Sequence, residues 1–167
     1  MITFQHVSFS YDSHGEQKAG QRTEDLQDIN LTVHDGECVL LTGKSGCGKT
    51  TMTRLINGLV PHFYPGKLRG EVLLDGRNIS EMPMYETASL VGSVFQNPRT
   101  QFFNVDTDSE IAFGLENRAF PREQIEEKVA TAAKDLKIEN LRGRNIFSLS
   151  GGEKQKIAFA SVYAMNP

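Results

Sequence analysis

The sequence contains no tryptophan and only two cysteines, Cys38 and Cys47. Two cysteines cannot build a disulfide scaffold, so we expect a protein of a reducing compartment such as the cytosol. The longest apolar run, Ile157 to Met165, is about half of the ~20 residues that a membrane-spanning helix needs. The first residues, Met-Ile-Thr-Phe-Gln-His, hold neither the basic leader nor the apolar core of a secretory signal. We therefore expect neither a membrane span nor secretion.

An excess of positive charge is also missing. Lysine and arginine total 18 against 21 aspartates and glutamates, which gives a net charge of −3. General nucleic-acid binders carry a basic surface, so we expect no nucleic-acid partner. The length of 167 residues fits about one domain, and a hydrophobic fraction of 38% is typical of an ordinary globular protein.

Apolar patterning predicts a mainly β first half. The expected strands cover residues 1–12, 29–33, 38–42, 71–75 and 90–95, with a polar surface connection at 13–25 and turns at 35–36 and 75–76. The strand at 38–42 is a continuous apolar run, which is typical of a buried parallel strand.

Helical signals dominate the second half. Thr107 followed by Glu110 has the spacing of a capping box, and Pro121 opens an amphipathic helix with apolar residues on one face. This order of elements predicts an α/β fold of two layers with a helical insertion.

The first chemical motif is Gly43–Thr50, which has the pattern G-x-x-x-x-G-K-[ST] between an expected strand and a helix at 51–59. Glycines let successive backbone N–H groups point inward, and the helix start adds its positive dipole, so the loop suits a di- or triphosphate. Lys49 would reach the β- and γ-phosphates, and the Thr50 hydroxyl would bind Mg²⁺. An ordinary glycine-rich turn is the alternative. The residues expected to bind nucleotide here are Gly43, Ser45, Gly46, Cys47, Gly48, Lys49, Thr50 and Thr51.

The second motif is Leu149-Ser-Gly-Gly-Glu-Lys-Gln155, directly before the apolar run that begins at Ile157. Ser150 and Glu153 have capping-box spacing, so the segment could do no more than start a helix. Capping gives no reason for Gly151 and Gly152, which lower helix propensity by about 1 kcal/mol each. Glycine at these positions indicates that another group approaches the backbone, and a bare helix start is a phosphate receptor.

Together, the motifs at 43–50 and 149–155 resemble the ATP-binding subunit of an ABC transporter, over essentially the whole chain. The resemblance implies a P-loop NTPase core with an N-terminal antiparallel β subdomain and an inserted helical subdomain. It assigns residues 1–104 to the core and β subdomain, 105–150 to the helical subdomain and 151–167 to the signature helix.

The resemblance also implies residue roles. Tyr11 matches the aromatic residue that stacks on adenine, and Gln96 matches a glutamine near Mg²⁺ and the attacking water, which makes Lys49 and Gln96 the catalytic groups and Thr50 and Gln96 the metal ligands. The residues that contact the γ-phosphate of ATP held by a second subunit are Ser150, Gly151, Gly152 and Glu153. Two subunits or modules in a head-to-tail dimer would thus complete one working site.

Three further segments narrow the resemblance. Gln96–Phe103, Ser109–Asn117 and Asn57–Tyr64 resemble the energy-coupling-factor branch, whose members import vitamins and transition-metal ions. The resemblance of Asn57–Tyr64 is greatest to subunits of this branch that carry two ATPase modules in tandem. The branch implies a peripheral protein on the cytoplasmic face of the cell membrane, with a transmembrane coupling subunit docked around Gln96 to Phe103. Phe102 and Phe103 would line the docking groove, although core packing explains an aromatic pair equally well.

Members of the family continue into an apolar strand that ends in Asp-Glu, and the present sequence ends before it. Val72–Asp75 looks similar to that strand, but Gly76 follows in place of a second carboxylate, and the family has a β-turn there. Without these carboxylates a P-loop site loses a Mg²⁺ anchor and the group that polarises water. We therefore expect the 167-residue chain to bind Mg-ATP weakly and not to hydrolyse it.

Two other functions share part of the pattern. A soluble ABC-type ATPase that remodels nucleic acid or a ribosome would favour a basic patch, against the net charge of −3. A small-molecule P-loop kinase would use the phosphate loop but has no use for residues 149–155.

Overall fold

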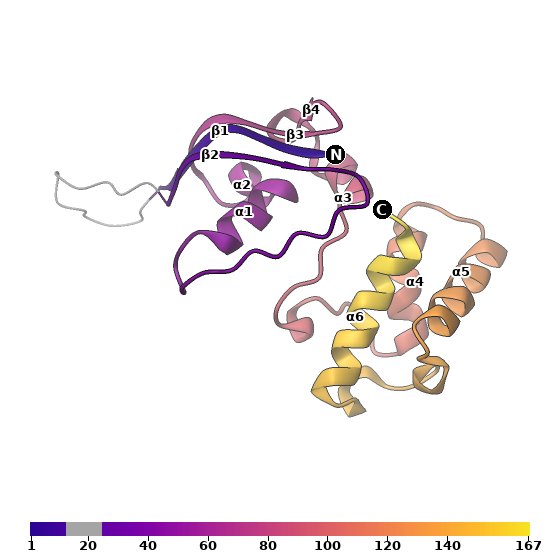
Figure 1. Ribbon diagram of the computed structural model, residues 1–167. Helices are drawn as coiled ribbons and strands as arrows, with labels where there is room; N and C mark the ends of the chain where they lie inside the picture. Colours follow the sequence, from indigo (N-terminus) through magenta and orange to yellow (C-terminus); the bar gives the residue numbers. More distant parts are fainter. Residues whose placement is uncertain (13–24) are drawn as a thin grey trace. The chain divides into compact units, whose positions relative to one another are not determined.

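The computed structural model describes residues 1–12 and 25–167. They form two compact units, Met1–Val91 and Gly92–Pro167, whose elements are labelled in Figure 1. The polar connection expected at 13–25 lies outside the described residues except for Asp25. The predicted borders after residues 104 and 150 stay predictions.

The first unit contains a four-stranded antiparallel sheet in the order β2-β1-β3-β4. Its strands are β1 (Ile2–Tyr11), β2 (Leu26–Val33), β3 (Gly66–Leu74) and β4 (Arg77–Asn78). The strands expected at 1–12, 29–33 and 71–75 are thus confirmed, as is the turn at 75–76 that joins β3 to β4.

The central strand β1 buries three residues that a regular strand would not place on one face. Phe4, Val7 and Phe9 are all 2% exposed or less, although Phe4 and Val7 are an odd number of residues apart. Both pairings of β1 shift register next to His6, which has a φ of +49°. This bulge adds one residue to the strand and returns Val7 to the buried face.

Helices complete the core of the first unit. The helices are α1 (Lys49–Ile56), α2 (Leu59–His62) and α3 (Met84–Leu90), with a 3₁₀ turn η1 at Ile79–Glu81. Figure 1 shows α1 and α2 on one side of the sheet. Their buried side chains join those of the strands in one cluster, which includes Phe4, Val7, Phe9, Leu55, Val60, Val72 and Ile79.

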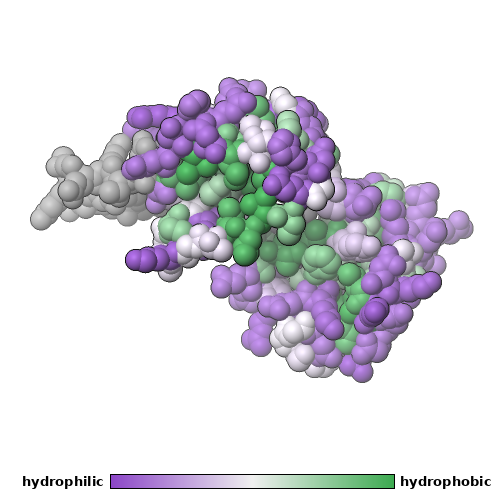
Figure 2. Space-filling model, in the orientation of Figure 1, coloured by the Kyte–Doolittle hydropathy of each residue, from purple (hydrophilic) through white to green (hydrophobic). Residues whose placement is uncertain are grey.

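Two of the expected strands are not formed. Residues 37–43 belong to no strand, and Leu40 is 84% exposed. The segment expected at 90–95 begins as the last residue of α3 and continues outside any strand, with Val94 and Phe95 about half exposed. A strand needs a neighbour for its backbone N–H and C=O groups, and among residues 1–12 and 25–167 the only sheet is β2-β1-β3-β4. Figure 2 shows hydrophobic side chains interrupting the polar surface.

The alternative interpretation of Val72–Asp75 as a catalytic strand is wrong. This segment is the end of β3, which pairs antiparallel with β1 and β4. Asp75 then enters the turn with a φ of +50°, and its carboxylate accepts a hydrogen bond from the N-terminal ammonium group of Met1.

The second unit is helical. It contains α4 (Thr107–Asn117), α5 (Arg122–Asp135) and α6 (Gly151–Met165), with 3₁₀ turns η2 (Pro98–Thr100), η3 (Glu139–Leu141) and η4 (Ile146–Ser148). Pro121 precedes α5, as predicted. The three helices pack on a core of their own, formed by residues that include Ile111, Leu115, Val129, Ala133, Ile138, Leu141 and Ile157. In the described part of the chain, no helix is both long enough and apolar enough to cross a bilayer.

The predicted capping box at Thr107 is wrong, because the helix begins one residue earlier. Asp106 is the N-cap, and its Oδ1 accepts a hydrogen bond 2.9 Å long from the Ser109 N–H. The side-chain and backbone hydrogen bonds with Ser109 lower the pKa of Asp106. Thr107 is buried, and its hydroxyl donates to the Leu141 carbonyl at 2.8 Å. The threonine hydroxyl is therefore used to fasten α4 to η3.

Candidate functional site

The loop at residues 43–48 has a backbone that only glycine adopts easily. Gly43, Gly46 and Gly48 have φ values of +146°, +83° and +91°. A Cβ on Gly48 would lie 2.5 Å from Leu26 Cδ2, and one on Gly43 would lie 2.7 Å from Cys47 Sγ. Backbone conformation and close packing both require glycine here, so the loop is a built structure rather than a permissive turn.

Helix α1 begins directly after this loop without a side-chain cap. Its N-cap is Gly48, and no acidic residue lies in the first turn. The first N–H groups of a helix have no partner within the helix, and the helix dipole makes that end positive. The start of α1 therefore offers backbone donors and a positive field to an anion.

Lys49 lies across the loop that precedes it. Its Nζ donates hydrogen bonds to the carbonyls of Gly43 and Lys44, both at 2.8 Å, and lies 3.4 Å from Cys47 Sγ. The ammonium group is thus held against the loop, which ends where α1 begins.

Thr50 and Thr51 face different surroundings. Thr50 is exposed, and its hydroxyl is a hard oxygen ligand of the kind that Mg²⁺ prefers. Thr51 is 6% exposed, and its Oγ1 lies 3.2 Å from the Tyr11 hydroxyl. In residues 1–12 and 25–167, no three or more His, Cys, Asp or Glu side chains form a group that could hold a metal ion.

Tyr11 is fixed at the end of β1. Its N–H donates to Asp25 Oδ2 at 3.0 Å, and its hydroxyl accepts from Arg54 Nη1 at 3.1 Å. The Arg54 guanidinium in turn lies 4.0 Å from the centre of the Tyr64 ring. Sequence reasoning missed Arg54 and Tyr64. The signal was the spacing of three residues between Thr51 and Arg54, which places both on the same face of α1.

The start of α6 contains the capping box whose spacing the sequence showed. Ser150 is the N-cap; its Oγ accepts from the Glu153 N–H at 3.4 Å, and Glu153 Oε2 accepts from the Ser150 N–H at 2.8 Å. Hydrogen bonding with Ser150 lowers the pKa of Glu153. Gly151 and Gly152 are exposed, and a Cβ at either position would meet nothing within 4 Å.

The segment from Gln96 to Phe103 divides its side chains between surface and core. Gln96 is exposed, and its predicted position beside the phosphates stays a prediction. Phe102 packs against the helical core, whereas Phe103 is 75% exposed and stacked on Phe113 with 4.7 Å between ring centres. Phe102 therefore packs in the core, and Phe103 lies at the surface.

A buried glutamate fixes this segment, and sequence reasoning missed it. Glu110 on α4 is 2% exposed, and its Oε2 accepts hydrogen bonds from the N–H groups of Phe103 at 3.0 Å and Asn104 at 2.8 Å. Glu110 was instead expected to belong to a capping box. Its carboxylate holds the backbone that carries Phe103.

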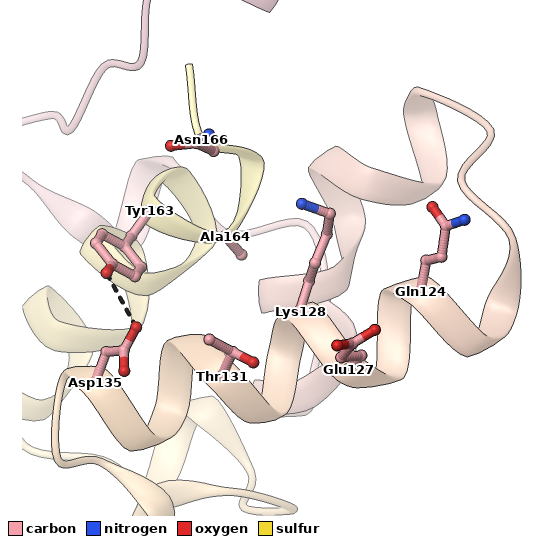
Figure 3. Close-up of a pocket in the computed structure, with 8 residues that line it drawn as sticks. All are labelled: Gln124, Glu127, Lys128, Thr131, Asp135, Tyr163, Ala164 and Asn166. Atoms are coloured by element: carbon pink, nitrogen blue, oxygen red, sulfur yellow. Dashed lines mark hydrogen bonds between the residues drawn. The ribbon is translucent and has the colours of Figure 1, made fainter.

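A pocket in the second unit is lined by none of the site residues that the sequence predicted. It has a volume of about 500 Å³ between α5 and the end of α6 (Figure 3). The Tyr163 hydroxyl donates to Asp135 Oδ2 at 3.1 Å, and this bond raises the pKa of Tyr163. Figure 3 shows Glu127 and Lys128 on α5. The lining mixes both charges and offers no convergent donor set for an anion.

The profile of the family described as "ABC transporter" matches residues 26–167. Among curated proteins, a putative ABC transporter ATP-binding protein of Treponema denticola is 57% identical over the whole chain, which covers 33% of that protein. The putative HMP/thiamine import ATP-binding protein YkoD of Bacillus subtilis is 39% identical, with 100% of the chain and 29% of that protein covered. The chain spans about a third of the length of such curated relatives.

Solved structures give the same result. CbiO1 from Clostridium perfringens, described as part of the ABC transporter complex cbiONQ, has a TM-score of 0.80 at 26% identity, covering 99% of the chain and 62% of cbiO1. The ATP-binding cassette MJ0796, solved as a dimer in a post-hydrolysis state with ADP and Pi, has a TM-score of 0.80 at 25% identity, covering 100% and 71%. The predicted α/β fold of an incomplete ABC ATPase domain is confirmed, as is the resemblance to the energy-coupling-factor branch. The chain therefore belongs to the ABC transporter family.

Proposed function

We propose that the chain is the ATP-binding, energy-coupling module of a membrane importer for a vitamin or a transition-metal ion. The observation that carries the proposal is the loop at 43–48, whose glycines are held in left-handed conformations before an uncapped helix start. Two relatives support it by their descriptions: YkoD is named as an import ATP-binding protein, and MJ0796 was solved with ADP and Pi.

The β- and γ-phosphates of ATP would bind the N–H groups of the loop and of the first turn of α1. Lys49 would exchange the carbonyls of Gly43 and Lys44 for phosphate oxygens, which gives its ammonium group a better partner. Thr50 would hold Mg²⁺, which supplies neutralisation of phosphate charge when it is bound. Tyr11 would stack on the adenine ring.

The ATP-binding site would be complete only in a head-to-tail dimer. Ser150, Gly151, Gly152 and Glu153 of a second subunit, or of a second module in tandem, would cover the γ-phosphate. Binding energy realised only in the closed dimer would shift the population toward closure, and hydrolysis would reopen it. Gln96 would lie near Mg²⁺ and the attacking water. A change in the bound nucleotide would thereby be transmitted to the segment from Gln96 to Phe103.

Phe103 would dock on a transmembrane coupling subunit at the cytoplasmic face of the cell membrane. Its ring is 75% exposed on a backbone fixed by Glu110, a combination that suits a rigid contact. Phe103→Glu in the full-length protein should release it from the membrane complex while ATP binding is kept. Phe147→Glu, at another exposed phenylalanine of the second unit (73%), is the control, and intact assembly of the Phe103 variant would contradict the docking role.

The nucleotide site is tested on the purified chain of 167 residues. We expect calorimetry to detect weak Mg-ATP binding and a phosphate assay to detect no steady release, because no Asp-Glu pair follows an apolar strand in this sequence. Lys49→Ala should abolish binding. Lys44→Ala should not, since Lys44 contributes its carbonyl rather than its side chain to the loop.

Steady phosphate release that disappears in Lys49→Ala would overturn the expectation of binding without turnover. Equal ATP binding by the chain and by Lys49→Ala would overturn the assignment of the loop itself.

A further inference from the structure

We propose that Arg54 is a positioning residue for the nucleobase: it holds the Tyr11 ring in place and thereby contributes to affinity for ATP without touching its phosphates. The inference rests on the proposed stacking of adenine on Tyr11, and it adds a residue to which neither the sequence motifs nor the family assignment gave a role.

The contacts form one connected group at the end of β1. Arg54 Nη1 donates to the Tyr11 hydroxyl at 3.1 Å, and the Thr51 Oγ1 lies 3.2 Å from the same hydroxyl. The guanidinium also lies over the Tyr64 ring, with 4.0 Å between Arg54 Cζ and the ring centre. The Tyr11 and Tyr64 rings are also in edge contact, at 6.4 Å between centres. Arg54 therefore joins Tyr11, at the end of β1, to Tyr64, in the segment between α2 and β3.

Tyr11 is fixed from its backbone as well. Its N–H donates to Asp25 Oδ2, and its ring meets Phe9 edge-on at 4.8 Å. Gly66, opposite Tyr11 in the ladder, has no room for a side chain, since a Cβ there would lie 2.4 Å from Phe9 Cζ and from the Ser10 carbonyl. The hydroxyl bonds remove the remaining freedom of the ring.

Such fixation matters because stacking is an interaction between two planes. A tyrosine at the end of a strand that rotates freely must lose that freedom when a base binds, and this loss reduces affinity. A ring already held by Arg54 and Thr51 has lost this rotational freedom on folding, before the base binds. A planar guanidinium suits this task because it can donate in its plane and stack on an aromatic face at the same time.

The charge of Arg54 offers a different explanation, in which the guanidinium attracts the phosphates directly. The two explanations separate when ATP is compared with inorganic tripolyphosphate, which has the phosphates and no base. A positioning role predicts that Arg54→Leu lowers ATP affinity about threefold to tenfold and leaves tripolyphosphate affinity unchanged. Direct attraction predicts a loss for both ligands.

The hydroxyl of Tyr11 provides a second arm. Tyr11→Phe keeps the ring and removes the hydroxyl that contacts both Arg54 and Thr51, so it should cost at least as much ATP affinity as Arg54→Leu. The double variant should cost no more than Tyr11→Phe alone, because Tyr11→Phe already removes the hydrogen bond with Arg54. Arg77→Leu is the matched control: Arg77 belongs to the same unit and pairs with Glu86 at 2.7 Å. It should leave both affinities unchanged.

Calorimetry of ATP and tripolyphosphate on these variants, with Tyr11→Ala added, distinguishes the possible failures. If Tyr11→Ala lowers ATP affinity about tenfold to a hundredfold and Arg54→Leu does not change it, the positioning role is wrong and the stacking role stands. If Tyr11→Ala changes nothing, the proposed stacking is wrong, and the inference fails with it. Additive losses from Arg54→Leu and Tyr11→Phe would also overturn the inference.

Discussion

Helices α1 and α6 both begin next to glycines, and the two starts are built in opposite ways. At α1 the glycines are required by the protein itself: Gly48 has a φ of +91° and Leu26 occupies the space of its missing Cβ. No side chain caps this helix. At α6 the capping box of Ser150 and Glu153 is complete, and the space around Gly151 and Gly152 is open.

The difference separates what folding requires from what binding requires. Packing within the chain fully explains the glycine at 48, so this glycine alone is no evidence for a ligand. The evidence for a ligand is the uncapped N–H groups at the start of α1. Among the described residues nothing lies close to Gly151 or Gly152, and glycine does not favour the helix. The proposed second subunit close to this helix start would explain both glycines.

The largest effect is expected for Gly48→Ala. A Cβ would force Leu26 to move and would hold a non-glycine residue in a left-handed conformation, which together should lower the free energy of unfolding by roughly 2 kcal/mol or more. ATP binding should be lost as well, because the loop cannot keep its shape. Urea denaturation and calorimetry measure the two effects.

Gly36→Ala is the control that tests a left-handed backbone conformation without a steric clash at the new Cβ. Gly36 has a φ of +74° and nothing within 4 Å of its absent Cβ, so the substitution should cost only about 1 kcal/mol and leave ATP binding unchanged. Equal losses of stability in both variants would show that the contact with Leu26 has no energetic role.

The next effect separates stability from assembly. Gly152→Ala should keep the free energy of unfolding or raise it by up to about 1 kcal/mol, because alanine is the better helix former and its methyl group meets no neighbour. In the full-length protein the same methyl group should weaken the ATP-dependent dimer, seen by light scattering with and without ATP. A variant that is both stable and fully able to dimerise would refute close approach at this helix start.

The sequence predicted both helix starts but only part of the sheet around them. Motif spacing fixed the loop at 43–48 and the cap at Ser150 because each depends on neighbouring residues. The strands expected at 38–42 and 90–95 failed for a different reason. Apolar runs indicate a preference for burial, whereas a strand also needs a partner for its backbone, and the described residues provide partners only within β1 to β4.

The contacts that position the site were the least visible in the sequence. Arg54 lies in α1 and Tyr64 between α2 and β3, and their pairing with Tyr11 depends on how β1 and α1 pack in the first unit. Glu110 had the spacing of a capping residue, but Asp106 begins the helix, and Glu110 binds the backbone of Phe103 and Asn104. A capping role and a bond to the preceding segment compete for the same side chain, and here the bond to the preceding segment prevailed.

The smallest effect concerns the pH dependence of the α6 cap. Hydrogen bonds with Ser150 lower the pKa of Glu153 below its ordinary value of 4.5, so the folded state favours the charged carboxylate. This stabilisation is complete above the pKa of the unfolded chain and is lost as the pH falls through the lower pKa of the folded chain. Glu153→Gln should therefore lower the thermal midpoint at neutral pH, and the difference from the unchanged protein should vanish in acid.

Glu127→Gln, on the exposed face of α5, controls for the loss of one negative charge and should leave the midpoint nearly unchanged. A difference between Glu153→Gln and the unchanged protein that persists at acid pH would mean that the Glu153 side chain acts through packing rather than through its charge. In that case the charge of Glu153 would not contribute to capping the start of α6. The start of α6 would then differ from that of α1 by its serine cap and by the open space at Gly151 and Gly152.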